Sequence, residues 1–501
     1  MSAARGRPAA VLGSRPRFRA RELPDRDTLL AGAITVGWAG LVGLALASGS
    51  ILAAVALAGA PLAGFGAVAL LGSDRTVLFL AAFGLTLTVP ALNGPLPLAG
   101  SVNVFAADLV VLASIAAWLP GRLLGGGGGK PLARSRAHRS AVLGAPLLLF
   151  GVVTFLAALR GHEEYGASLL GQPMRLVAYA AIVTAMVEID AKKAWKGLTA
   201  VFYVGAVWQA INGIYFIAIG GSQTDAADLS TGGTRYLALD VSLYVAAALL
   251  LALLNIRYDS AGRRRILHVA IVLVATFDVL ITFGRGVYIA VAVFSLVLMM
   301  TYKEIRRTLL RAMPVLAPLL VVAVLFVPPE IRQVAPTFAA RVTPEIGYDA
   351  SVRWREEANK AILEQYHESP AFGVGFGRGA SFTLNNEEWV IDQDPHNSYV
   401  YLLAGGGLLL LSSFVLLVLC YGYDAWRRFR SAERPEERAL VVFSALALLT
   451  FLVNAGIEPL FTYPSVLLTL WALFVLPTIV PLRERHRAGR RGRTEPPPSF
   501  E

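Results

Sequence analysis

Residues 399–421 read YVYLLAGGGLLLLSSFVLLVLCY and contain no charged side chain. A helix crosses about 30 Å of bilayer hydrocarbon in roughly 20 residues, so this stretch is long and apolar enough to span a membrane. A helix of a soluble protein usually keeps a polar face. The stretch therefore predicts a transmembrane helix.

The same pattern recurs along the whole chain. Of the 501 residues, 56% are hydrophobic and 16% are charged, against roughly 25% charged residues in an average soluble domain. We therefore expect an all-α polytopic membrane protein with about 14 (12–14) transmembrane helices. The predicted spans are 29–48, 51–72, 76–92, 104–119, 141–159, 173–188, 197–220, 236–256, 266–283, 286–301, 313–327, 399–421, 439–454 and 462–479.

The distribution of positive charge predicts the orientation. With the N-terminus inside, the inside segments hold about three quarters of the 45 Lys and Arg residues, as cytoplasmic segments of membrane proteins do. The net charge of +11 is then a topology signal, and no nucleic-acid partner is expected. The predicted order is a cytoplasmic basic tail (1–28), transmembrane helices (29–327), a large external loop (328–397), further transmembrane helices (398–480) and a second cytoplasmic basic tail (481–501).

The external loop is the one long outer connection. Within it, residues 351–366 place Trp354 and Ile362 on one side at helical spacing, which predicts an amphipathic helix. Residues 373–379 are rich in glycine and predict tight turns, without the Lys-Ser/Thr ending of a phosphate-binding loop. The loop is shorter than a catalytic domain of about 100–150 residues, so we expect an active site shared with the outer helix ends.

Four arginines stand at predicted outer helix ends or at the start of the loop helix: Arg175, Arg235, Arg285 and Arg353. A single arginine at the end of a span is often only an interfacial anchor. Several together favour a shared anionic ligand, because guanidinium groups bind phosphate oxygens in bidentate geometry. A lipid-linked diphosphate in the outer leaflet fits this prediction.

His396 stands in Asp392-Gln-Asp-Pro-His-Asn-Ser-Tyr399, directly before an apolar span. Histidine titrates near about pH 6.5 and can accept a proton from a hydroxyl group, and Asp394 could orient the ring. The alternative is structural, because this segment also fits the start of a helix, which a histidine can cap. Asp392 and Asp394 are too few ligands to indicate a metal site, and we expect neither a metal nor a cofactor.

Three segments follow one another in a characteristic order. They are Gly284-Arg-Gly286 between two spans, the Arg353 helix with its Pro370-Ala-Phe-Gly-Val-Gly-Phe-Gly377 turn, and His396-Asn-Ser-Tyr399 at the start of a span. Together they resemble the O-antigen ligase/polymerase family of bacterial envelope glycosyltransferases. Gly284 stands where that family usually has serine, and Gly405 stands where an acidic residue is common.

The resemblance implies a metal-independent, inverting glycosyltransferase at the outer face of the cytoplasmic membrane, with both termini in the cytoplasm. The donor would be a glycan on undecaprenyl diphosphate, the acceptor a hydroxyl of a glycan or lipid-anchored molecule, and membrane lipids would surround both. The implied catalytic residues are His396 as the base and Arg285 and Arg353 as cations. Substrate contacts are predicted for Arg175, Arg235, Arg355, Asn397 and Tyr399.

Two other functions remain open from the sequence. A polymerase would use the same donor and join lipid-linked repeat units of an O-antigen, capsule or exopolysaccharide. A transporter of polysaccharide or lipid would need ionisable residues inside its spans, where Asp108, Asp240 and Asp278 are the main candidates.

Overall fold

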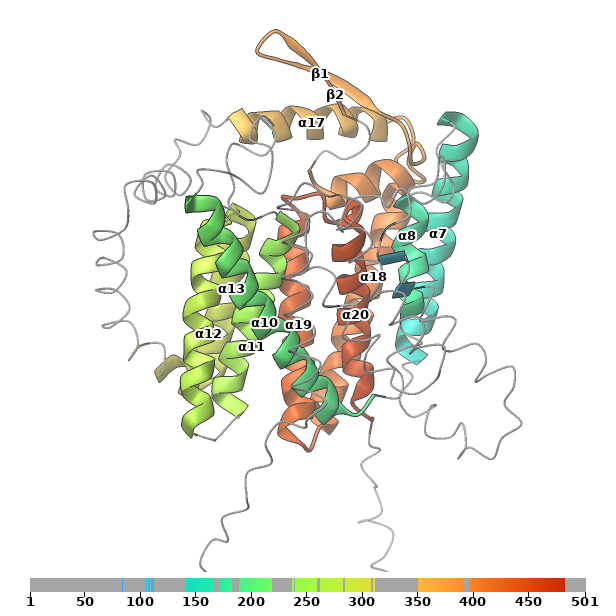
Figure 1. The fold of residues 1–501 in the computed structure, drawn as a ribbon. Coiled ribbons are helices and arrows are strands. Elements are labelled where there is room, and N and C mark those ends of the chain that lie inside the picture. The colour runs from blue at the N-terminus through green and yellow to red at the C-terminus, as the bar shows by residue number, and fades with distance from the viewer. Residues whose placement is uncertain are drawn as a thin grey trace, which may run out of the picture.

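The fold is a helical bundle with a small cap at one end (Figure 1). The computed structural model describes residues 141–165, 172–182, 189–218, 239–258, 262–282, 284–307, 350–391 and 396–482, with single positions at 83, 105, 107, 108, 110, 111, 237 and 310. The bundle contains α7 (Ala141–Tyr165), α8 (Gln172–Ala178), η1 (Tyr179–Ile182), α10 (Ala191–Ala218), α11 (Leu239–Tyr258), α12 (Gly262–Ile281), α13 (Arg285–Thr301), α18 (Ser398–Ser431), α19 (Pro435–Ala455), η3 (Leu460–Thr462), α20 (Pro464–Val475) and η4 (Leu476–Ile479).

Among the described residues, five helices are long and apolar enough to cross a membrane, and two shorter apolar helices accompany them. The predicted helical membrane protein is thereby confirmed, whereas the number of spans is not. The predicted spans 29–48, 51–72 and 313–327 lie outside the described residues, as do nearly all of 76–92 and 104–119. The prediction of one helix over 173–188 is wrong in part, because α8 ends at Ala178 and the chain continues as the 3-10 helix η1.

Burial separates a central helix from peripheral ones. The membrane-crossing window of α11 is 83% buried, and that of α7 is 33% buried. Accordingly α11 is apolar on all sides and packs against α10, α12, α13 and α19, whereas α7 exposes Leu148, Phe155 and Leu156. Exposed apolar faces of this kind fit a lipid environment.

Helix α18 is broken near its start. Gly407 has φ 66° and ψ −165°, a backbone conformation essentially reserved for glycine. Figure 1 shows the part before the break lying beneath α17 and the remainder running down through the bundle. Because of the break, the first helical turns of α18 lie across the end of the bundle.

The cap consists of α17 (Ala350–Tyr366) and a hairpin formed by β1 (Ala380–Leu384) and β2 (Glu387–Ile391). The helix prediction for 351–366 is confirmed, and Trp354 and Ile362 face its packed side, 5% and 1% exposed. These side chains pack with Leu384 and Ile391 of the hairpin and with the start of α18.

The hairpin is an element that the sequence analysis, which expected short helices in this loop, did not predict. Asn385 and Asn386 connect the strands with φ values of 54° and 67°, and positive φ at both central residues is what the favoured two-residue turn requires. Phe382 faces Trp389 across the strands. The sequence signal for this hairpin was the alternation of apolar and polar residues from Ala380 to Leu384, directly before the Asn385-Asn386 pair.

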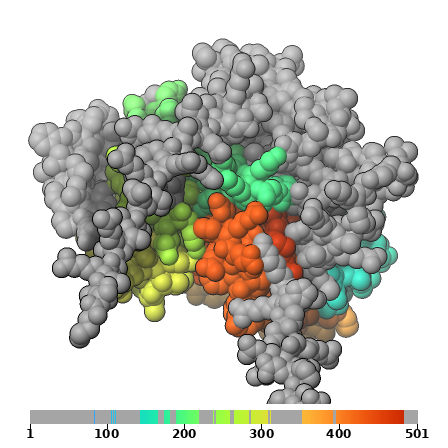
Figure 2. Space-filling model, turned by 90° about the horizontal axis from the view of Figure 1, so that it is seen from below, coloured from blue at the N-terminus to red at the C-terminus, as the bar shows by residue number. Residues whose placement is uncertain are grey.

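The opposite end of the bundle centres on the α18–α19 connection, which lies in the middle of Figure 2. Arg428 is fully buried there. Its Nε donates to Asp424 Oδ2 at 2.6 Å and its Nη1 to the carbonyl oxygens of Thr478, at 3.3 Å, and Val480. A buried charge needs such partners, so Arg428 ties the end of α18 to the segment after α20.

Candidate active site

The position of the cap depends on residues 370–377, here called the docking turn, which bind the broken helix α18 through their backbone. Val374 N–H donates to the Ala404 carbonyl at 2.8 Å, and Gly375 N–H donates to the Gly405 carbonyl at 3.0 Å. In return, Leu408 N–H donates to the Pro370 carbonyl at 2.9 Å, and Leu409 N–H to that of Ala371 at 3.1 Å. In an unbroken helix, the amides of residues 408 and 409 would bond to the carbonyls of residues 404 and 405. The docking turn therefore supplies the hydrogen bonds that the break removes from α18.

The docking turn also contacts α7. Phe376 N–H donates to the Ala157 carbonyl at 3.3 Å, and Arg160 Nη1 donates to the Gly373 carbonyl at 2.6 Å. A Cβ atom on Gly405 would overlap the Phe376 ring, which explains why no acidic side chain stands at that position here. The glycine-rich segment thus places the cap against two bundle helices.

His396 lies where the cap meets the start of α18. The N-cap of α18 is Asn397, whose side-chain oxygen accepts hydrogen bonds from the N–H groups of Tyr399 at 3.1 Å and Val400 at 3.3 Å. The alternative interpretation of His396 as the helix cap is therefore wrong. His396 has φ 54°, a conformation uncommon outside glycine and often found at functional sites.

The His396 ring lies between an aromatic side chain and a carboxylate. It packs edge-to-face on Trp354 with ring centroids 5.2 Å apart, and its Nδ1 lies 3.8 Å from Glu458 Oε2. The other carboxylate oxygen, Oε1, accepts a long hydrogen bond of 3.5 Å from Arg355 Nη2. The side chains of His396, Arg355 and Glu458 are 18%, 15% and 3% exposed, so a buried carboxylate joins a histidine and an arginine that remain accessible.

Glu458 is the residue that the sequence analysis missed. It lies in the connection after α19, far along the chain from the last segment that carries the family resemblance, His396–Tyr399. Ser398 Oγ donates to the Glu458 carbonyl at 2.9 Å and accepts from Leu460 N–H at 2.9 Å. Because Ser398 begins α18, this buried hydroxyl cross-links the backbone near His396 to the backbone that carries the carboxylate. An acidic residue beside the end of an apolar span was the signal that could have found it.

The Gly284-Arg285-Gly286 turn lies against the same connection. Arg285 begins α13, and only its backbone belongs to the described part of the structure. A Cβ atom on Gly286 would lie 2.5 Å from Asn454 Oδ1, so the start of α13 packs directly on the last turn of α19. This contact brings the turn close to the segment that holds Glu458.

We expect Gly286→Ala to destabilise the protein. The added methyl group must displace the buried Asn454 side chain, whose Nδ2 donates to the Thr450 carbonyl at 2.9 Å, and overpacking of this kind costs about 1–3 kcal/mol. Gly284→Ala is the matched control, because its Cβ would find no atom closer than 3.5 Å. Thermal unfolding of the two detergent-solubilised variants compares them, and equal midpoints would contradict the inferred packing.

The remaining predicted site residues have diverse surroundings. Arg353 is exposed on α17, and the Tyr399 hydroxyl donates to the Leu452 carbonyl at 2.6 Å. Arg175 Nε donates to Asp108 Oδ1 at 2.9 Å, so this aspartate is an ion-pair partner. Substrate contacts by Arg175, Asn397 and Tyr399 stay predictions, and Arg235, Asp392 and Asp394 lie outside the described residues.

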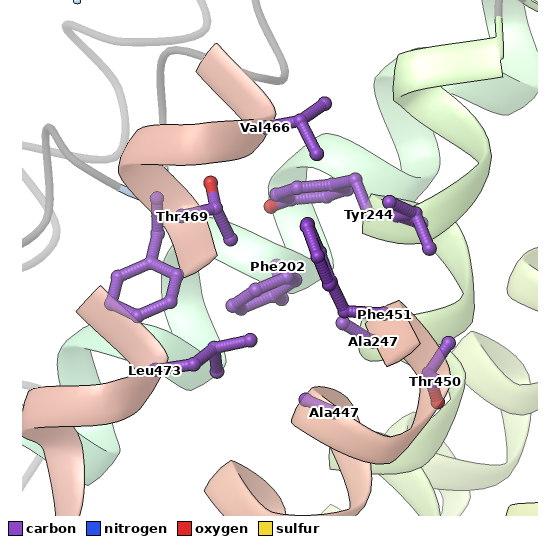
Figure 3. A pocket seen from close by; sticks show the side chains of 11 residues that line it. Phe202, Tyr244, Ala247, Ala447, Thr450, Phe451, Val466, Thr469 and Leu473 are labelled. Atoms are coloured by element: carbon purple, nitrogen blue, oxygen red, sulfur yellow. The ribbon is translucent and has the colours of Figure 1, made fainter. Parts of the chain in front are cut away.

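A separate pocket lies deeper in the bundle, between α10, α11, α19 and α20 (Figure 3). Its volume of about 30 Å³ corresponds to the space of one water molecule, and its lining includes Phe202, Phe451 and Leu473. The Tyr244 hydroxyl is engaged with the Val201 carbonyl at 2.7 Å. The pocket is too small for a sugar or a diphosphate, and none of the predicted site residues lines it.

Comparison with known proteins identifies the region around the cap. Residues 269–415 match the family model described as O-antigen ligase. The match includes the Gly284–Gly286 turn, α17, the docking turn, His396 and the break in α18, and it ends before Glu458. No curated protein matches the chain.

Proposed function

We propose that this protein, a membrane protein of the O-antigen ligase/polymerase family, transfers a glycan from undecaprenyl diphosphate to an acceptor hydroxyl. The observation that carries the proposal is the position of His396, next to a buried carboxylate and a partly exposed arginine at the end of a membrane bundle. A donor whose lipid chain lies in the bilayer would present its diphosphate at the membrane surface, close to this end of the bundle.

The proposed reaction is a single displacement. The acceptor oxygen forms a bond to the anomeric carbon of the donor sugar while the bond from that carbon to the diphosphate oxygen breaks, and the electron pair leaves with the diphosphate. His396 Nε2 takes the proton of the acceptor hydroxyl, a role typically worth about 10²–10⁴-fold in rate. Arg355, Arg285 and Arg353 are the proposed cations for the diphosphate, and fixed charges can stabilise developing negative charge.

The proposed location is the outer face of the cytoplasmic membrane, with both termini inside. The far end of α18 supports this orientation. Tyr423 and Trp426 are both 52% exposed there, and Arg430 lies over the Trp426 ring at 5.1 Å. Exposed aromatic side chains beside arginines are typical of a cytoplasmic membrane interface. His396, at the opposite end of α18, would then face outward.

The test is glycan transfer by the purified full-length protein in lipid nanodiscs, with a lipid-diphosphate glycan as donor. We expect transfer to continue in EDTA, because the proposed mechanism neutralises the negative charge of the diphosphate with arginine side chains and not with a metal ion. Separate reactions supply either a lipid-anchored core oligosaccharide or only further lipid-linked repeats. A single addition to the core supports a ligase, and a ladder of products supports a polymerase. Transfer that is lost in EDTA and restored by a divalent cation would contradict the metal-independent mechanism and indicate metal binding at Asp392 and Asp394.

A further inference from the structure

We infer that Glu458 is a positioning residue shared by Arg355 and His396, and that binding of the donor diphosphate shifts it from the arginine to the histidine. The inference rests on the proposed function, because it assigns a control over the base of that reaction. It makes donor binding the event that prepares His396 to accept a proton.

The distances place Glu458 between two partners. Its carboxylate oxygens lie 3.5 Å from Arg355 Nη2 and 3.8 Å from His396 Nδ1. Charge-assisted hydrogen bonds between nitrogen and oxygen are usually about 2.7–2.9 Å long, so both distances leave room to shorten. Glu458 is fixed by its backbone through Ser398, and a small side-chain rotation is enough to favour one partner over the other.

A diphosphate would compete for Arg355. The guanidinium is 15% exposed, whereas Glu458 is 3% exposed, so an incoming anion reaches the arginine and not the carboxylate. When the Arg355 guanidinium turns toward phosphate oxygens, its attraction to the buried Glu458 carboxylate becomes weaker. A buried charge that loses a charged partner is destabilised, and an N–H group at His396 Nδ1, 3.8 Å from Glu458 Oε2, is placed to donate to it.

The shift would improve His396 as a base. A carboxylate that accepts from Nδ1–H fixes the ring tautomer that leaves Nε2 free, and it stabilises the imidazolium formed when the acceptor proton arrives. In the described structure, the Glu458 carboxylate faces His396, and Arg355 faces the other oxygen of that carboxylate. Asp392 and Asp394 precede His396 closely in the chain, and their side chains, like that of Arg285, belong to the part that the structure does not describe.

The experiment compares two charge removals with opposite expected effects on the pH profile of kcat/KM for transfer. Glu458→Gln should lower kcat about 10- to 100-fold, as a part of the base contribution. It should also shift the acidic limb of the profile, where kcat/KM rises with pH, to lower pH. The reason is that the protonated His396 ring loses the neighbouring Glu458 carboxylate. Arg355→Gln should move that limb to higher pH and raise the donor dissociation constant by roughly tenfold or more, because a cation near both groups is lost.

The cap offers a matched control pair. Arg378 donates two hydrogen bonds to Glu368, at 2.6 Å and 2.8 Å, and this pair lowers the pKa of the Glu368 carboxyl. Glu368→Gln and Arg378→Gln therefore break a comparable ion pair on the exposed side of the cap. Both should keep the wild-type pH profile and donor affinity.

The possible results separate a failure of the inferred role of Glu458 from a failure of the proposed function. Opposite limb shifts, with the limb returned toward wild type by Glu458→Asp, support the inference. If Glu458→Gln fails to fold, the direction of the limb in Arg355→Gln still decides, because an unmoved limb overturns the shared carboxylate. A wild-type protein without any transfer would remove the proposed function itself. Normal transfer with unmoved limbs in both variants would remove only the role of Glu458.

Discussion

Transfer by His396→Asn is expected to fall by about 10²–10⁴-fold relative to wild type, the range for loss of a general base. Asparagine is the informative substitution, because it tolerates the positive φ of this position and keeps a polar side chain beside Trp354 and Glu458. It has no ring nitrogen that can take the acceptor proton. Initial rates with the lipid-diphosphate donor measure the effect, and His396→Ala should lose at least as much.

The control is the other histidine of the cap. His367 follows α17, is exposed and packs against Tyr366 with ring centroids 5.6 Å apart. His367→Asn should keep the wild-type rate, and donor binding should remain in both variants because the proposed cations are unchanged. If His396→Asn transfers at the wild-type rate, His396 only shapes the turn before α18 and the base lies elsewhere.

Gly161→Ala is expected to lower transfer by about 10²-fold or more, although the residue lies on α7, away from the proposed catalytic residues. The new Cβ would overlap the Phe376 carbonyl oxygen and lie 2.6 Å and 2.7 Å from the carbonyl carbon and amide nitrogen of that residue. All three are backbone atoms, so no side-chain rotation relieves the clash. The docking turn must move away from α7, and displacement of a catalytic group by about 1 Å can cost about 10²-fold in rate.

Gly144→Ala on the same helix is the matched control. Its Cβ would have no neighbour within 4 Å, and alanine in a helix is favoured over glycine by roughly 0.8–1 kcal/mol. We expect full transfer and equal or higher thermal stability for this variant. Limited proteolysis of the cap should be faster in Gly161→Ala only. Full transfer by Gly161→Ala would show that the cap does not need its contact with α7.

The sequence was most informative where one local pattern decides the structure. The helical spacing of Trp354 and Ile362 predicted α17, and uncharged apolar stretches predicted α7, α10, α11, α18 and α19. The family resemblance led to His396 because its motif is continuous in the chain. In each case neighbouring residues carry the signal, so a single sequence is sufficient.

The parts that depend on distant contacts could not be predicted in this way. Three consecutive glycines at 405–407 indicate a weak point in a helix, but they do not reveal that the backbone of the docking turn replaces the lost hydrogen bonds. Glu458 is a single acidic residue in a short connection, and its role depends on contacts with α17 and α18. The same holds for Arg175, whose pairing with Asp108 follows from helix packing.

The contacts of the docking turn also mean that the proposed site can form only when the chain is nearly complete. The docking turn binds α7, where Arg160 and Gly373 are 213 residues apart in the chain, and it binds α18, which the ribosome makes after the loop. A nascent chain that ends before α18 has no Gly405–Gly407 break to receive the docking turn, and no connection after α19 to supply Glu458. Under the proposed function, stalled or truncated chains would lack transferase activity, so unfinished copies would not consume lipid-linked glycan.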